Sequence, residues 1–219
     1  MTKFLRLFTF LPLLLWGQAW AACPARSTEP SVVINTADSG VTYIPNASLQ
    51  VIMGAAANAG GTNVSPNLRG LTVVRLDTRM SISTAYMSDG KKLCAYPVKV
   101  DLFVGYSASQ VVYILERYPA GTCQYNAVRA HENTHVQINT ETLKALIPQL
   151  EVAMKTAVMH PGYPIEAPSK EWAQEAIRKS LSDLLRAYVD AHIQQRASLN
   201  GSIDTPESYA LVQRLCPTW

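Results

Sequence analysis

The chain has 219 residues, 48% of them hydrophobic, and 19 Lys and Arg against 16 Asp and Glu give it a formal net charge of +3. It has no basic stripe and no run of like charge, which excludes the electrostatic pattern of a nucleic-acid-binding protein. No repeat and no Pro/Gly/Ser-rich linker divides the sequence, so we expect a single domain over residues 22–219.

The first 21 residues are typical of a secretory signal peptide. Lys3 and Arg6 form the positive start, residues 7–16 are apolar, and Ala19-Trp20-Ala21 has the form of an A-x-A cleavage site. Neither this stretch nor any later segment approaches the about 20 apolar residues that a transmembrane helix needs. We therefore expect an exported protein, periplasmic or secreted. Lipid attachment at Cys23 is the weaker alternative, because Trp20 stands where a lipoprotein signal has a small aliphatic residue.

Short apolar or alternating runs between turn residues predict a mostly antiparallel β-sheet in the first half of the chain. The runs are residues 31–35, 41–44, 49–53, 71–76 and 80–86. Glycines and small residues predict a long surface loop over residues 54–70.

Residues 92–104 and 109–117 predict a β-hairpin, whose register places Cys94 opposite Cys123. An even number of cysteines in an exported protein indicates disulfides, so we expect the pairs Cys94–Cys123 and Cys23–Cys216. Zinc ligation by the cysteines is the alternative, but the sequence has no CxxC spacing.

Helices are predicted over residues 125–147, 148–159 and 168–199, with a turn at 160–168. Pro148 should kink or end the first helix, because its ring removes an N–H group and clashes with the preceding turn. Thr205 as N-cap and Pro206 as first helical residue predict a short terminal helix. Strands followed by helices indicate the α+β class.

Residues 131–135 read His-Glu-Asn-Thr-His, an HExxH motif within the first predicted helix. At about 3.6 residues per turn, His131 and His135 share one face of the helix, and the surrounding apolar residues turn that face inward. Two neutral imidazoles suit Zn²⁺, which lowers the pKa of a bound water to about 7, and Glu132 is placed to take the proton. The alternative is that both histidines are core residues and Glu132 is a buried salt-bridge partner.

The run from Cys123 to His135 resembles an uncharacterised bacterial secreted family described as zinc-dependent proteases, and the wider resemblance covers about residues 93–216. It implies a zincin-like peptidase fold: an N-terminal, mostly antiparallel sheet, then the HExxH helix and an antiparallel helical hairpin. A metzincin is excluded, because Ile138 and Glu141 stand where that pattern needs Gly and His.

Catalytic zinc usually takes three protein ligands, so the motif needs a partner elsewhere. If the helices on either side of the turn pair about a centre at residues 161–165, the segment opposite the motif is about 187–199. His192 continues the apolar stripe of the last helix there, so we predict His192 as the third ligand. A buried core histidine is the alternative for His192. Four other candidate ligands stay open, namely Asp190, Glu141, Asp204 and Glu207.

The sequence favours an exported peptidase that hydrolyses polypeptides with Zn²⁺ as cofactor. In this hypothesis His131, His135 and His192 bind the metal, and Glu132 activates the water as general base. A substrate strand is expected to add to the edge of the sheet beside the helix. Two other functions stay open: an envelope binding or scaffolding protein with a structural or inactive motif, and a zinc amidase that acts on cell-wall peptides. The oligomeric state is left open.

Overall fold

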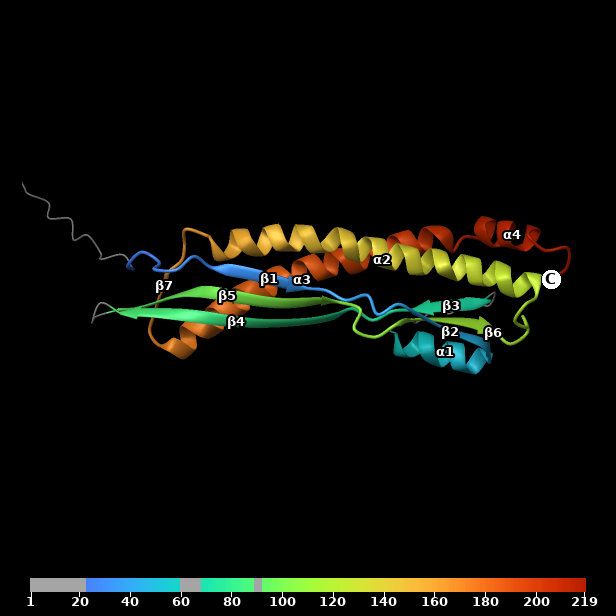
Figure 1. Cartoon of the computed structure of the whole chain (residues 1–219), viewed down its shortest axis with the longest axis horizontal. Coiled ribbons are helices and arrows are strands. Elements are labelled where there is room, and N and C mark those ends of the chain that lie inside the picture. Colours follow the sequence, from blue (N-terminus) through green and yellow to red (C-terminus); the bar gives the residue numbers. More distant parts are fainter. Residues whose placement is uncertain (1–22, 60–67, 89–91) are drawn as a thin grey trace, which may run out of the picture.

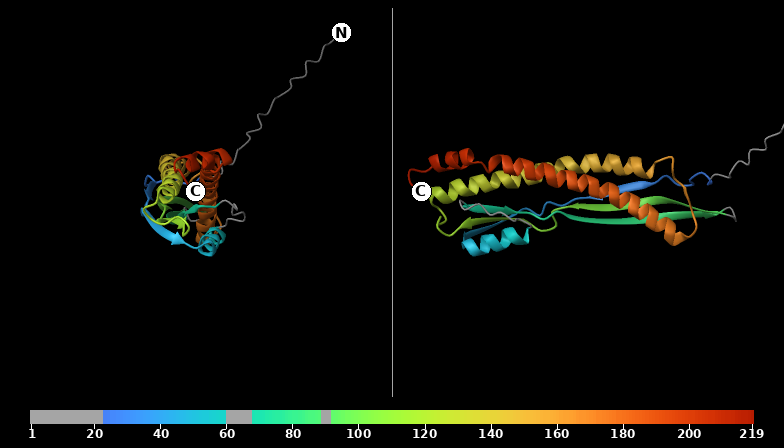
Figure 2. Two further views of the ribbon diagram at one scale, coloured as in Figure 1. Left: turned by 90° about the vertical axis from the view of Figure 1, so that its right-hand side faces the viewer. Right: turned by 180° about the vertical axis from the view of Figure 1, so that it is seen from behind.

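The computed structural model describes residues 23–59, 68–88 and 92–219. In this part of the chain seven strands form two small mixed sheets and four helices accompany them, which confirms the α+β class. The molecule is elongated: the two sheets follow one another end to end, and two long helices run side by side along them (Figure 1; Figure 2). No helix within the described residues is long and apolar enough to cross a membrane, and the predicted signal peptide lies outside them.

The first sheet is built around a long central strand. Its members are β1 (Ser31–Asn35), β4 (Asp77–Ser88), β5 (Leu93–Gly105) and β7 (Ile165–Ala167). β4 pairs antiparallel with β5 along its length. The other edge of β5 pairs with both β1, which runs parallel to it, and β7, which runs antiparallel. Buried Val100, Leu102 and Val104 alternate along β5 and pack in a core with the long helices.

The second sheet is smaller and lies beside the HExxH motif. Its strands are β2 (Val41–Ala47), β3 (Gly70–Val73) and β6 (Gln110–Leu115). The central strand β6 is parallel to β2 and antiparallel to β3. β3 is therefore an edge strand. Two mixed sheets, in which three of the five strand pairings are antiparallel, replace the one mostly antiparallel sheet that was predicted.

The predicted hairpin over residues 92–117 is wrong. β5 and β6 belong to different sheets and run in the same direction (Figure 1). Each is the central strand of its own sheet. Val104 of β5 packs in one core cluster, whereas Val112 and Ile114 of β6 pack in the other. The link between the strands therefore carries the chain onward instead of reversing it, and Tyr106 within it forms an isolated parallel bridge with Asp38.

A helix replaces the strand predicted at residues 49–53. This helix, α1 (Leu49–Asn58), begins at an N-cap, Ser48, whose hydroxyl accepts a hydrogen bond from the Val51 N–H. Ile52 and Ala56 are its buried residues, and their spacing of four is helical, which the apolar run alone did not reveal. Residues 60–67 of the predicted loop lie outside the described residues.

Three further helices follow the strands: α2 (Cys123–Val158), α3 (Lys170–Ile203) and α4 (Pro206–Arg214). The hydroxyls of Thr122, Ser169 and Thr205 cap their N-termini, which confirms the predicted cap and start of the terminal helix. α2 and α3 form the predicted antiparallel hairpin.

Pro148 does not end the helix that contains it, so the two helices predicted over residues 125–159 are one, α2, of 36 residues. Pro148 itself is exposed, but Leu146, Leu150 and Met154 around it are buried in the first core. Burial of a Leu-sized side chain stabilises by about 1.5–3 kcal/mol, so several such residues offset the about 3 kcal/mol that an interior proline costs.

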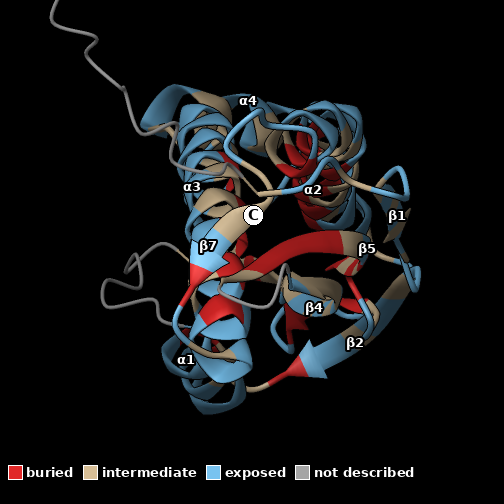
Figure 3. Cartoon of the chain, turned by 90° about the vertical axis from the view of Figure 1, so that its left-hand side faces the viewer, coloured by how far each residue is buried: buried red, intermediate tan, exposed pale blue. Residues whose placement is uncertain are grey.

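The buried residues concentrate along the inner side of α2 and on β5 (Figure 3). They form two clusters, one between the first sheet and the helices α2 and α3, the other between the second sheet, α1 and the N-terminal part of α2. The HExxH motif lies on α2 at the level of the second cluster, close to β3.

Two disulfides are present, but with a different pairing from the predicted one. They join Cys23 to Cys94 and Cys123 to Cys216. The predicted pairs, Cys94–Cys123 and Cys23–Cys216, depended on the hairpin register that the structure contradicts. Because β5 starts at one end of the molecule and α2 starts at the other, Cys94 and Cys123 lie far apart (Figure 1). Two disulfides fit an exported protein.

Candidate metal centre

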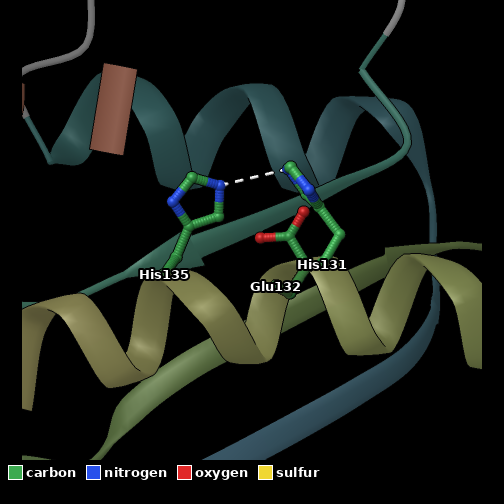
Figure 4. A group of neighbouring side chains, drawn as sticks. All are labelled: His131, Glu132 and His135. Atoms are coloured by element: carbon green, nitrogen blue, oxygen red, sulfur yellow. Dashed lines mark hydrogen bonds between the residues drawn. The ribbon is translucent and has the colours of Figure 1, made fainter. Parts of the chain in front are cut away.

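The two imidazoles of the motif point toward one another across one turn of α2 (Figure 4). His131 Nε2 lies 3.3 Å from His135 Nε2, and the Glu132 carboxylate lies beside them. The side chains of His131 and His135 are only 8% and 10% exposed, which confirms that this face of the helix is turned inward. His131, Glu132 and His135 form a group that could hold a metal ion, since their donor atoms all lie within 4.8 Å of one another.

A second carboxylate, that of Asp204 at the C-terminal end of α3, completes the cluster. Its Oδ1 lies 3.0 Å from His131 Nε2 and 3.1 Å from His135 Nε2. Tyr209, in the second turn of α4, donates a hydrogen bond of 3.0 Å to the same oxygen. Three metal-ligating atoms from two helices therefore converge on one point.

The spacing of these three atoms fits a tetrahedral zinc site. With zinc–ligand bonds of about 2.0–2.1 Å, the ligand atoms of a tetrahedron lie roughly 3.3 Å apart. The three separations between His131 Nε2, His135 Nε2 and Asp204 Oδ1 are 3.0, 3.1 and 3.3 Å. The donor set, two imidazoles and one carboxylate, is of the kind found in catalytic zinc sites that keep one position open.

The Glu132 carboxylate is held by the edge strand β3. The Thr72 hydroxyl donates a hydrogen bond of 2.8 Å to Glu132 Oε2, and the carboxylate packs against Gly70. A Cβ at position 70 would lie 2.6 Å from Glu132 Oε1, so only glycine leaves room for the carboxylate there. Burial raises the pKa of Glu132, although the two imidazoles and Thr72 act in the opposite direction.

The charges of the cluster are coupled. Burial alone would lower the pKa of His135, but the Asp204 and Glu132 carboxylates outweigh it, and the pKa is raised. Burial disfavours the Asp204 anion, yet its close contacts with both imidazoles hold the pKa of this carboxyl well below its usual range. The pKa of Tyr209 is strongly raised, by burial and by the Asp204 charge, so its hydroxyl stays protonated as a donor.

A cavity of about 280 Å³ opens beside the cluster, between β3 and the C-terminal half of α3. It is reached by Glu132, His135, Asp204 and Tyr209, and the Asp204 side chain is 40% exposed. Residues 70–74 also line it, as do Ile193, Arg196, Ala197 and Asn200 of α3. The cluster is therefore accessible from one side.

His192, predicted as the third ligand, does not lie at the cluster. It is buried on α3 next to a separate cavity lined by Leu146 and Tyr188, and neither ring nitrogen has a hydrogen-bond partner among the described residues. Burial lowers its pKa. His192 is thus a buried core histidine, as in the alternative interpretation. Asp204, one of the four other candidate ligands, lies beside His131 and His135 instead.

The remaining candidate ligands are also elsewhere. Asp190 and Glu207 are exposed, and Glu141 forms a surface ion pair with Lys144. Sequence reasoning missed three residues that contact His135 or Glu132, namely Asn200, Thr72 and Gly70. Only the register of the helical hairpin and the place of β3 reveal them, since nothing local in the sequence points to them.

No family model matches the chain, and the searches of curated proteins and of solved structures find no match either.

Proposed function

We propose that this chain is an exported zinc-dependent peptidase of the zincin type. The observation that carries the proposal is the convergence of His131 Nε2, His135 Nε2 and Asp204 Oδ1 within 3.3 Å, with Glu132 beside them and a cavity in front. A core packing role would not require three metal-ligating atoms to share one point at the edge of an open cavity. The resemblance of residues 123–135 to secreted zinc-dependent proteases supports the same function.

When bound, zinc would polarise a scissile carbonyl and lower the pKa of an attacking water. His131, His135 and Asp204 would hold the ion. Glu132 would accept the proton of the water and would pass it to the leaving amine. Tyr209 would offer its O–H to the negative charge that develops on the carbonyl oxygen.

The cavity also suits an extended polypeptide as substrate. β3 pairs only with β6 among the described residues, and residues 70–74 line the cavity. A peptide could therefore add antiparallel or parallel to the free edge of β3 by main-chain hydrogen bonds, and its scissile bond would lie in front of Glu132. Such binding gives affinity with little sequence preference.

The test compares the mature wild-type protein with Glu132→Gln and with Glu141→Gln, an exposed control on the same helix. We measure bound zinc and the hydrolysis of casein and of quenched peptides. Glu132→Gln should keep one zinc and lose about 10²–10⁴-fold in rate, because general base catalysis contributes that much. Glu141→Gln should match the wild type.

An active Glu132→Gln protein would contradict the proposed role of Glu132. A wild-type protein that binds no zinc and hydrolyses nothing would contradict the peptidase and favour a binding or scaffolding protein. Hydrolysis of muropeptides but not of casein would instead indicate a cell-wall amidase.

A further inference from the structure

A chain of side-chain hydrogen bonds leads from the motif, across the helices, to the junction of the two sheets. It starts at His135 Nδ1, which lies 2.7 Å from Asn200 Oδ1, and Asn200 Nδ2 lies 3.2 Å from Asn139 Oδ1. Asn139 Nδ2 lies 3.0 Å from Gln110 Oε1, and Gln110 Nε2 lies 3.1 Å from Thr140 Oγ1. The last link, from Thr140 Oγ1 to Asp38 Oδ2, is 2.8 Å.

In each of these hydrogen bonds only one assignment of donor and acceptor is possible. The Asp38 carboxylate accepts but does not donate, so the Thr140 hydroxyl donates to it and accepts from the Gln110 amide. The Gln110 oxygen then accepts from Asn139, and the Asn139 oxygen accepts from Asn200. The Asn200 oxygen is therefore the atom that faces His135, and the His135 Nδ1 must carry the proton.

A second contact fixes the same orientation of Asn200. Its Nδ2 also donates a hydrogen bond of 2.9 Å to the main-chain carbonyl of Arg196, which can only accept. Gln110 and Asn139 are fully or almost fully buried, at 0% and 3% exposure, so a reversed amide would leave buried groups unsatisfied. The orientation of the Asn200 side-chain amide is thus fixed by two hydrogen bonds.

We propose that Asn200 is a positioning residue, which fixes His135 as the tautomer whose Nε2 offers its lone pair to the metal. This inference rests on the proposed metal site and adds to it the group that prepares one of its ligands. A neutral His135 with its proton on Nδ1 places the Nε2 lone pair 3.1 Å from Asp204 Oδ1. Two electron-rich atoms at that distance favour a cation between them, which is how a preformed zinc site is arranged.

The first test needs neither metal nor activity. Long-range ¹H–¹⁵N NMR on the metal-free protein at about pH 9, where an imidazole is neutral, reports which nitrogen of His135 is protonated. The wild type should show the Nδ1-protonated form. Asn200→Ala should show a mixture of both forms, and Asn200→Asp, which keeps an acceptor oxygen, should restore the wild-type form. A wild-type His135 protonated on Nε2, or an Asn200→Ala protein with unchanged tautomer, would overturn the proposal.

The second test is the affinity for Zn²⁺ of the same proteins, measured by competition with a chromophoric chelator. Loss of an outer hydrogen bond to a ligand costs about 10–100-fold in metal affinity, so Asn200→Ala should lose that much and Asn200→Asp far less. The control is Gln194→Ala, an exposed change on the same helix, which should bind zinc like the wild type. Equal affinity of Asn200→Ala and the control would overturn the positioning role.

The two tests separate this inference from the proposed function. A wild-type protein that binds zinc without hydrolysing peptides would refute the proposed peptidase activity. The NMR and affinity results would still decide whether Asn200 positions His135.

Discussion

Asp204 is the residue on which the composition of the proposed metal centre depends. Its carboxylate is within 3.1 Å of both imidazoles and accepts a hydrogen bond from Tyr209, whereas His192 lies in a separate part of α3. Because outer hydrogen bonds alone change metal affinity by about 10–100-fold, removal of a direct ligand should cost more than about 100-fold.

We therefore expect Asp204→Asn to weaken zinc binding by more than about 100-fold, measured by chelator competition. Two changes on the same helix serve as controls. Asp190→Asn alters an exposed carboxylate, and His192→Leu replaces a buried imidazole for which the described part of the chain offers no hydrogen-bond partner. Both should bind zinc like the wild type. Loss of zinc in His192→Leu with Asp204→Asn intact would reverse the assignment of the third ligand.

Gly70 lies against Glu132, the proposed general base. A methyl group at this residue would lie 2.6 Å from Glu132 Oε1 and would push the carboxylate from its place beside the imidazoles. Gly70→Ala should keep zinc and lower kcat about ten- to a hundredfold, since a shift of about 1 Å in a reacting group has an effect of that order. Gly54→Ala is the matched control, because nothing lies within 4 Å of a Cβ there. Equal kcat values for the two variants would show that Glu132 is not held by β3.

At the scale of elements, the HExxH helix was predictable because its apolar periodicity and its motif agree. Its inward-facing histidines are confirmed. The position of Asp204 beside the two histidines was not predictable from the same pattern, because it depends on the register between α2 and α3. The link between these helices contains β7, which pairs with β5, and this places Asn200 and Asp204, rather than residues 187–199, opposite the motif.

The prediction of the strands from the sequence was limited in the same way. Apolar runs located β1, β4 and β6, but they did not distinguish a buried strand from the short buried face of α1. Nor could they show that β5 and β6 lie in different sheets, because pairing partners are set by packing over long sequence separations. The wrong hairpin register then produced the wrong disulfide pairs.

Pro148 offers a test of how α2 is stabilised. It is exposed in the interior of a continuous helix, where a proline lacks the N–H that would donate to the carbonyl of Lys144. Pro148→Ala should restore that hydrogen bond and raise the free energy of unfolding by about 1–2 kcal/mol, measured by denaturant titration. Gln149→Ala, its exposed neighbour, should change it by less than about 0.5 kcal/mol. A destabilised Pro148→Ala protein would indicate that tertiary packing requires the proline geometry.

At the scale of the whole molecule, the two disulfides fasten opposite ends of an elongated structure (Figure 1). Cys123–Cys216 ties the start of α2 to the segment directly after α4, and the loop that it closes contains His131, His135 and Asp204. Cys23–Cys94 lies at the other end, by the start of β5.

Replacing either pair by serine should lower the free energy of unfolding by about 2–5 kcal/mol, because each disulfide closes a long loop in the unfolded chain. Only the Cys123→Ser/Cys216→Ser protein should also bind zinc more weakly, since α4 and Asp204 lose their attachment to α2. The Cys23→Ser/Cys94→Ser protein is the matched control. Equal zinc affinities would show that the disulfide at the metal end does not support the site.

The most direct test of the account is a crystal structure of the mature protein with one equivalent of zinc, with anomalous data collected at the zinc edge. We predict one peak about 2.0–2.2 Å from His131 Nε2, His135 Nε2 and Asp204 Oδ1, with a fourth position open to the cavity beside Glu132. A structure without a peak at this cluster, a peak ligated by His192, or a closed site in which Glu132 is itself a ligand would contradict it.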